Sequence, residues 1–179
     1  MKKIKLFLQL ILVLFIFVVA FQLGKNTKPI SSIETKYSTK QDSAFEPIAE
    51  EMDSSDLKKI YVPVYSHIYV SKGDILEMAV TLSIRNTDRK NKIKIERVDY
   101  FSTNGKKLRS YFAKGLELSA LESKEVFIKD FDTEGGSGAN FIVYLSYDEG
   151  TNPTLVESIM SSRSTTNSFV FSSRGEYIK

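Results

Sequence analysis

Three tyrosines surround the only histidine of the chain in one short stretch, and these side chains are the best suited to binding chemistry. They are Tyr61, Tyr65, His67 and Tyr69, all at odd-numbered positions. Because successive side chains of a strand point to opposite faces, the four would share one face of a strand. Such a stripe could bind a glycan or a peptide. Aromatic residues are also frequent in strands for packing alone, so we favour an aromatic edge that packs against a neighbouring strand.

A second candidate is the glycine-rich loop 130–140. Its polar residues and glycines are Asp130, Asp132, Glu134, Gly135, Gly136, Gly138 and Asn140. Alternate carboxylates ahead of a glycine are typical of the opening of a calcium loop, but Phe141 stands where such a loop needs a bidentate Glu. A complete EF-hand is therefore excluded.

Two interpretations of this loop remain open. In the first, its glycines supply positive φ angles for a tight connection, and Asp130, Asp132 and Asn140 cap backbone N–H groups. In the second, Asp130, Asp132 and Glu134 hold a weak structural calcium with the Asn140 amide, or the loop receives a ligand against its glycine backbone. We favour the first and expect no cofactor.

Catalysis is not expected. The chain has no cysteine, which excludes thiolate catalysis, disulfides and cysteine-based zinc sites. His67 would have to be the base of any Ser-His-Asp arrangement, but no Gly-x-Ser-x-Gly elbow exposes a serine. Carboxylate pairs of the glycosidase type can be drawn from Asp130, Asp132, Glu134 or Glu157, as from any chain with 22 carboxylates.

Charge excludes a nucleic-acid binder. The net charge is +3, yet the chain from Ile60 onward carries 16 Lys and Arg against 15 Asp and Glu. A protein that binds nucleic acid needs a basic face or stripe. The near-neutral part of the chain offers none.

An apolar segment runs from Leu6 to Leu23, directly after Lys2, Lys3 and Lys5. As a helix it would be about 27 Å long, close to the roughly 30 Å hydrocarbon core of a bilayer. We therefore expect residues 1–23 to be a membrane anchor that contacts the lipid bilayer through residues 6–23, with a cytoplasmic N-terminus. The alternative is a signal sequence cleaved near Ala20, which would release the rest to the periplasm.

Two further segments follow the anchor. Residues 24–58 are polar, contain Pro29 and Pro47, and are expected to be a flexible linker. Residues 59–179 show seven to nine short strand signals, among them the alternating run Glu77–Arg85. Asn104-Gly105 predicts a type I′ hairpin between two of these strands. We expect an all-β, immunoglobulin-like antiparallel β-sandwich.

Three stretches of this domain, Ile60–Tyr69, Val80–Thr87 and Gly135–Val143, resemble in their order and spacing a bacterial family called domain of unknown function 3124. The resemblance covers roughly Ile60 to Ile178. It implies an exported bacterial protein and implies no activity.

The expected function is a non-catalytic binding module displayed in the periplasm or on the cell surface. Its partner would be a protein, a peptide or an envelope polymer. One alternative is an envelope hydrolase that acts on glycan or ester bonds. Another is a structural subunit of a membrane assembly, with the anchor helix as the contact element.

Overall fold

The computed structural model describes residues 4, 13–19, 21–22, 45–46, 53–163 and 168–179. The chain divides into two units, Met1–Lys40 and Gln41–Lys179. In the first unit, residues 13–19 and 21–22 are helical. No helix within the described residues is long and apolar enough to cross a membrane. Most of the predicted anchor, the cleavage position Ala20 and most of the linker 24–58 lie outside the described residues.

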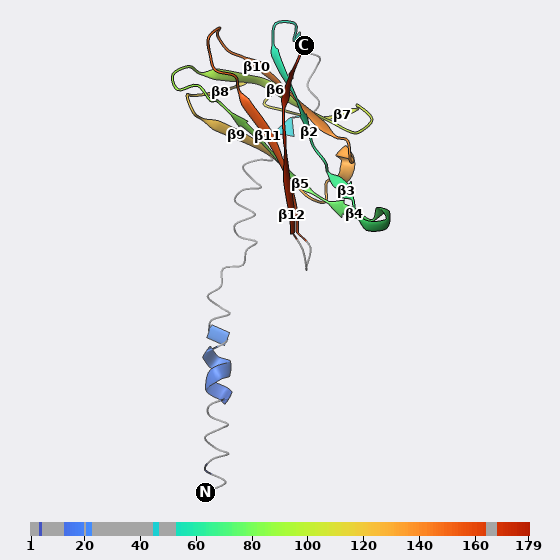
Figure 1. Cartoon of the computed structure of the whole chain (residues 1–179). Coiled ribbons are helices and arrows are strands. Elements are labelled where there is room, and N and C mark those ends of the chain that lie inside the picture. The colour runs from blue at the N-terminus through green and yellow to red at the C-terminus, as the bar shows by residue number, and fades with distance from the viewer. Residues whose placement is uncertain (1–3, 5–12, 20, 23–44, 47–52, 164–167) are drawn as a thin grey trace. The chain divides into compact units, whose positions relative to one another are not determined.

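The second unit is mostly β and antiparallel (Figure 1). Its larger sheet has seven strands, in the order β1 (Phe45–Glu46), β7 (Lys107–Tyr111), β6 (Ile93–Phe101), β10 (Asn140–Ser146), β2 (Lys58–Pro63) and β13 (Glu176–Ile178), with β8 (Leu116–Leu118) paired to β6. The smaller sheet has four, in the order β12 (Ser168–Arg174), β11 (Leu155–Arg163), β5 (Ala79–Arg85) and β9 (Ser123–Ile128). A separate two-stranded ribbon joins β3 (His67–Tyr69) to β4 (Ile75–Glu77). Two 3-10 turns, η2 (Ser71–Gly73) and η3 (Thr133–Gly135), complete the described elements.

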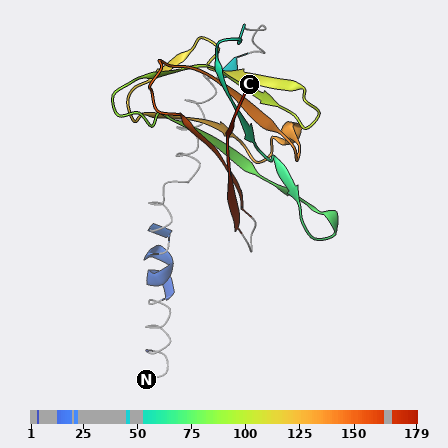
Figure 2. The same ribbon diagram turned by 45° about the horizontal axis from the view of Figure 1, so that its top comes forward.

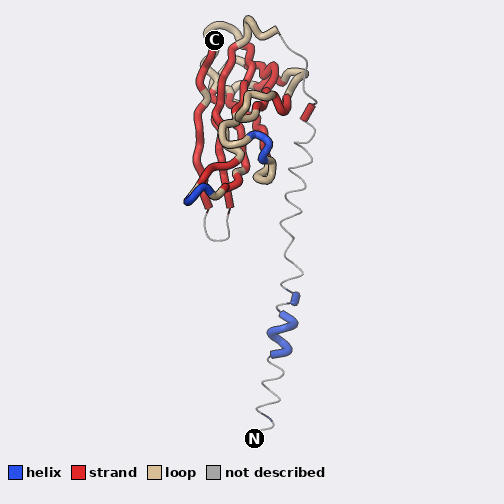
Figure 3. Tube along the Cα trace, turned by 90° about the vertical axis from the view of Figure 1, so that its right-hand side faces the viewer, coloured by secondary structure: helices blue, strands red, loops and turns tan. Residues whose placement is uncertain are grey.

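The two larger sheets pack face to face around one apolar core (Figure 3). The alternation of β5 places Val80, Leu82 and Ile84 in this core, and Phe141 and Val143 of β10 enter it from the other sheet. All five side chains are fully buried. Burial of apolar side chains from two facing sheets is the main source of stability in such a fold. The prediction of a mostly antiparallel, sandwich-like β domain is confirmed.

The run Glu77–Arg85 is buried on one face as expected, but its other face is not fully exposed to solvent. Ser83 is only 2% exposed. Its strand is internal to the sheet, and the cross-strand partners Glu125 and Glu157 flank it. Arg85 Nε also donates a hydrogen bond of 3.1 Å to Ser83 Oγ.

The hairpin between β6 and β7 has a different turn from the one predicted. Gly105 has a positive φ of 75°, and Asn104 does not. Gly105 N–H donates to the Ser102 carbonyl at 2.9 Å, and the register shifts between Tyr100 and Phe101. This combination is a type I turn followed by a glycine bulge, whereas type I′ needs positive φ at both central residues.

The C-terminal segment belongs to both sheets, which the sequence did not predict. β12 pairs with β11 in the smaller sheet, and β13 pairs with β2 in the larger one. Gly175 lies between them and donates to the Val156 carbonyl at 2.9 Å. A Cβ at this position would lie 2.6 Å from Ile60 Cγ2, so only glycine fits where the chain crosses the core edge.

Candidate functional site

The four aromatic residues of the predicted stripe do not share one strand, which corrects the sequence analysis. β2 ends at Pro63, and residues 64–66 lie between it and β3. Tyr61 therefore lies on the larger sheet, between Ile142 and Glu176. His67 and Tyr69 lie on β3, in the separate ribbon.

The ring contacts of these residues differ accordingly. Tyr65 packs at 5.7 Å, centroid to centroid, against Phe171 of β12. His67 meets Tyr69 edge-on at 5.4 Å. His67 Nε2 is buried without a hydrogen-bond partner. Tyr69 remains 64% exposed.

The glycines of loop 130–140 are needed mainly for close approach rather than for positive φ. Only Gly136 has a positive φ, 81°. A Cβ on Gly135 would lie 1.9 Å from Tyr100 Oη. Gly138 N–H donates to Thr103 Oγ1 at 2.9 Å, and a Cβ there would lie 3.2 Å from Thr103 Cγ2. The loop thus lies directly on the β6–β7 hairpin.

Arg109 of β7 binds two of the three carboxylates proposed as calcium ligands. Its guanidinium forms ion pairs with Asp132 and, at 3.0 Å, with Glu134. Asp130 instead accepts a hydrogen bond from the Phe131 N–H at 3.1 Å. Within the described part of the chain, no group of three or more Asp, Glu or His side chains is placed to hold a metal ion. The Arg109 guanidinium occupies the position between two of the proposed calcium ligands.

Arg109 also lies above Tyr100, with its guanidinium carbon 5.9 Å from the ring centroid. Tyr100 is fully buried, and its hydroxyl has no hydrogen-bond partner. Burial, followed by the negative charge of Asp132, raises the pKa of Tyr100. The hydroxyl therefore stays protonated, and this cluster attaches the loop to the core.

The structure brings the two predicted candidates together. Ser66 donates to the Gly136 carbonyl twice, through its N–H at 3.1 Å and its hydroxyl at 3.0 Å. Val64 N–H donates to the Ala139 carbonyl at 3.0 Å, and Met78 N–H to the Ser66 carbonyl at 2.9 Å. The base of the β3–β4 ribbon is thereby joined to loop 130–140 at one end of the sandwich (Figure 1).

Four large apolar side chains are exposed at this end, and we call them the apolar end: Tyr69, Val70, Ile75 and Phe131. Tyr69 and Ile75 are cross-strand partners in the ribbon. Ile75 is 59% exposed and Phe131 is 72% exposed. The ribbon leads into β5, where Val80 pairs with Ile128 just ahead of Phe131. Sequence reasoning missed three of the four, because an apolar residue beside a strand is normally buried.

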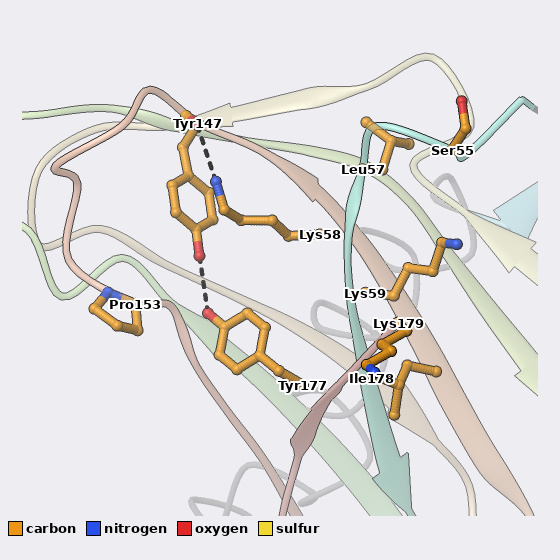
Figure 4. Close-up of a pocket in the computed structure, with 9 residues that line it drawn as sticks. All are labelled: Ser55, Leu57, Lys58, Lys59, Tyr147, Pro153, Tyr177, Ile178 and Lys179. Carbon is orange, nitrogen blue, oxygen red and sulfur yellow. Dashed lines mark hydrogen bonds between the residues drawn. The ribbon is translucent and has the colours of Figure 1, made fainter.

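A pocket of about 610 Å³ lies at the opposite end, near the start of β2 (Figure 4). The hydroxyls of Tyr147 and Tyr177 are 3.0 Å apart, and Lys58 Nζ lies 4.0 Å from the centroid of the Tyr147 ring. Burial, followed by the hydrogen bond with Tyr177, raises the pKa of Tyr147. No local sequence pattern indicates this pocket, because its residues come from three separate segments.

Comparisons with known proteins identify a family. The crystal structure of Thermotoga maritima 1070 is similar, with 12% sequence identity over 70% of this chain and 96% of that one, and a TM-score of 0.42. No curated protein matches the chain. Residues 57–178 match the family described as protein of unknown function (DUF3124), and the chain belongs to that family.

Proposed function

We propose that this protein is a non-catalytic binding module, displayed outside the cytoplasm, whose apolar end binds a partner protein or peptide. The observation that carries the proposal is the exposure of Tyr69, Ile75 and Phe131 on two segments tied to one framework. Large apolar side chains exposed at one end of a domain are a feature of interaction sites.

The ribbon is placed to meet a partner. It extends away from the two sheets, with η2 at its tip (Figure 2). Its base is held by the hydrogen bonds of Ser66 and Met78. A surface that is already ordered loses little conformational entropy on binding, and loops on a rigid scaffold are common binding elements.

The chemistry of the apolar end favours a protein or peptide. Tyr69 and Phe131 offer large rigid rings, which contribute much of the contact energy in protein interfaces. Lys129 Nζ lies 5.8 Å from the centroid of the Phe131 ring and adds one positive charge beside it. An envelope polymer, whose sugars would stack on the same rings, is the alternative ligand.

Display outside the cytoplasm rests on the sequence. We propose residues 1–23 as the anchor, 24–58 as the linker and 59–179 as the domain, with an immunoglobulin-like arrangement of the sandwich. In support, residues 13–19 are helical and carry exposed apolar side chains, Phe17 being 76% exposed. A reporter that is active only outside the cytoplasm, fused after Lys179, should be active.

The test of binding is cross-linking and capture from solubilised membranes with the full chain. The double variant Tyr69→Ser, Ile75→Ser should reduce partner recovery at least tenfold, because it removes apolar contact without changing the core. Tyr177→Ser, in the pocket at the other end, is the matched control and should bind as the unaltered protein does. Melting temperatures establish that each variant is folded.

Three outcomes would contradict the proposal. Unchanged recovery with the double variant would show that the apolar end does not bind. If Tyr177→Ser alone reduces partner recovery, the binding site is the pocket and not the apolar end. If replacing only residues 6–23 abolishes partner recovery, the protein is better described as a structural subunit that assembles through its anchor.

A further inference from the structure

β12 is an open edge of the smaller sheet. Its seven residues pair with β11 on one side. On the other side no strand pairs with it within the described part of the chain. Along such an edge, every second residue points its N–H and C=O groups away from the sheet, where another strand can bind them.

The other edges are short or charged. β1 has two residues and β13 has three. β9, at the far edge of the smaller sheet, carries Lys124 and Glu125. These are common ways in which proteins prevent edge pairing. β12 has neither a charge nor a proline from Ser168 to Ser173.

The sequence of this edge is symmetrical. Ser168-Phe169-Val170-Phe171-Ser172 reads the same in both directions. Two antiparallel copies related by a twofold axis at Val170 would place that valine opposite its own copy, and Phe169 opposite Phe171. Residues that face each other across an antiparallel pair share a face of the sheet, so identical types meet throughout.

The side chains on this edge fit that arrangement. Phe171 is partly buried against the core, opposite Met160. Phe169 is 45% exposed and Val170 is 68% exposed. A second strand alongside would cover both, and aromatic cross-strand pairs stabilise an antiparallel contact.

We infer that two copies of this chain pair antiparallel through β12, so that their four-stranded sheets become one continuous sheet. A second copy is favoured over a foreign strand because the matching of side chains arises from the strand's own symmetry. A twofold contact is also self-closing, which limits the assembly to a dimer. The surface is distinct from the apolar end of the proposed function.

The test begins with the mass of the full chain in detergent, by light scattering or sedimentation. The unaltered protein should be a dimer at micromolar concentration. Val170→Lys places two like charges opposite each other at the axis and should weaken the dimer at least tenfold. Val170→Thr keeps the branched shape without charge and should remain dimeric. Because Val170 is exposed in one copy, neither change should alter the melting temperature of the monomer by more than a few degrees.

Because the chain has no cysteine, a single introduced thiol reports the geometry directly. Val170→Cys should form a disulfide-linked dimer on mild oxidation, since symmetry-related residues at the axis have Cα atoms about 4.5–5.5 Å apart. Ile159→Cys is the matched control, because this partly exposed position lies on β11, one strand further from the axis. It should form no disulfide-linked dimer under the same oxidation.

Each remaining outcome overturns the inference. A monomeric unaltered chain, equal cross-linking at both positions, or a dimer unaffected by Val170→Lys would show that β12 does not pair with itself. If the unaltered chain is monomeric and Val170→Lys abolishes capture of a partner protein, β12 pairs with a strand of that partner and not with a second copy. Partner capture through Tyr69 and Ile75 is measured separately, so failure of either idea is recognisable.

Discussion

The N–H and the hydroxyl of Ser66 both donate to the carbonyl oxygen of Gly136, at 3.1 and 3.0 Å. These residues are 70 positions apart in the chain. The contact joins the β3–β4 ribbon to loop 130–140, so two segments that look independent in the sequence form one end of the sandwich. The candidate site depends on this contact, because it places Tyr69 and Phe131 on a common framework.

Asp132 should contribute more to stability than Glu134, although both bind Arg109. The Asp132 side chain is 18% exposed, whereas that of Glu134 is 66% exposed and therefore screened by water. Asp132→Asn should lower the free energy of unfolding by about 1–3 kcal/mol. The matched change Glu134→Gln should lower it by less than about 1 kcal/mol. Urea unfolding measures both, and equal losses would contradict this division.

Calcium should leave the melting temperature of the protein unchanged. Asp132 and Glu134 are already paired with the Arg109 guanidinium, which would have to be displaced. The measurement is thermal unfolding with millimolar calcium and then with a chelator. A rise in melting temperature that Asp132→Ala abolishes would instead establish a metal site in loop 130–140.

Stability should fall in acid partly through Asp88. The backbone N–H groups of Asn91, Asn152 and Lys90 donate to its carboxylate and lower its pKa from 3.8 to about 2. Because the folded pKa is the lower one, the unfolded chain binds more protons in this range. The contribution of Asp88 is therefore complete above about pH 4 and is lost as the pH falls towards 2.

The variant Asp88→Asn isolates that contribution. It should be less stable than the unaltered protein at pH 7, and its stability should depend less steeply on pH between about 4 and 2. Chemical unfolding at a series of pH values gives both slopes. Parallel slopes for the two proteins would show that Asp88 does not titrate as proposed.

Gly175→Val should destabilise the domain by about 1–3 kcal/mol, the usual range for overpacking. A Cβ at Gly175 would lie 2.6 Å from Ile60 Cγ2 and 2.9 Å from Val62 Cγ2, and both of these side chains are fully buried. Ser172→Ala, at an exposed position of the preceding strand, is the control and should have little effect. If Gly175→Val unfolds at the same denaturant concentration as the control, the side chains of Ile60 and Val62 do not pack closely against Gly175.

The sequence by itself determined the fold class and the family. The alternating run Glu77–Arg85 contains β5, and a hairpin at Asn104-Gly105 joins β6 to β7. The apolar run at Phe141–Leu145 lies within β10, between β6 and β2, as a central strand should. These features are readable because alternation and apolar runs are local properties of the chain. The match of residues 57–178 to the family likewise follows from the sequence alone.

Only the tertiary structure decided which residues meet and which remain exposed. Pro63 separates Tyr61 from His67 and Tyr69, and Arg109 binds the carboxylates of a loop distant in the chain. The exposure of Phe131 and the open edge of β12 depend on where the other strands end. The physical reason is that these contacts join segments far apart in the sequence. Pairing between distant strands, rather than local preference, places them side by side.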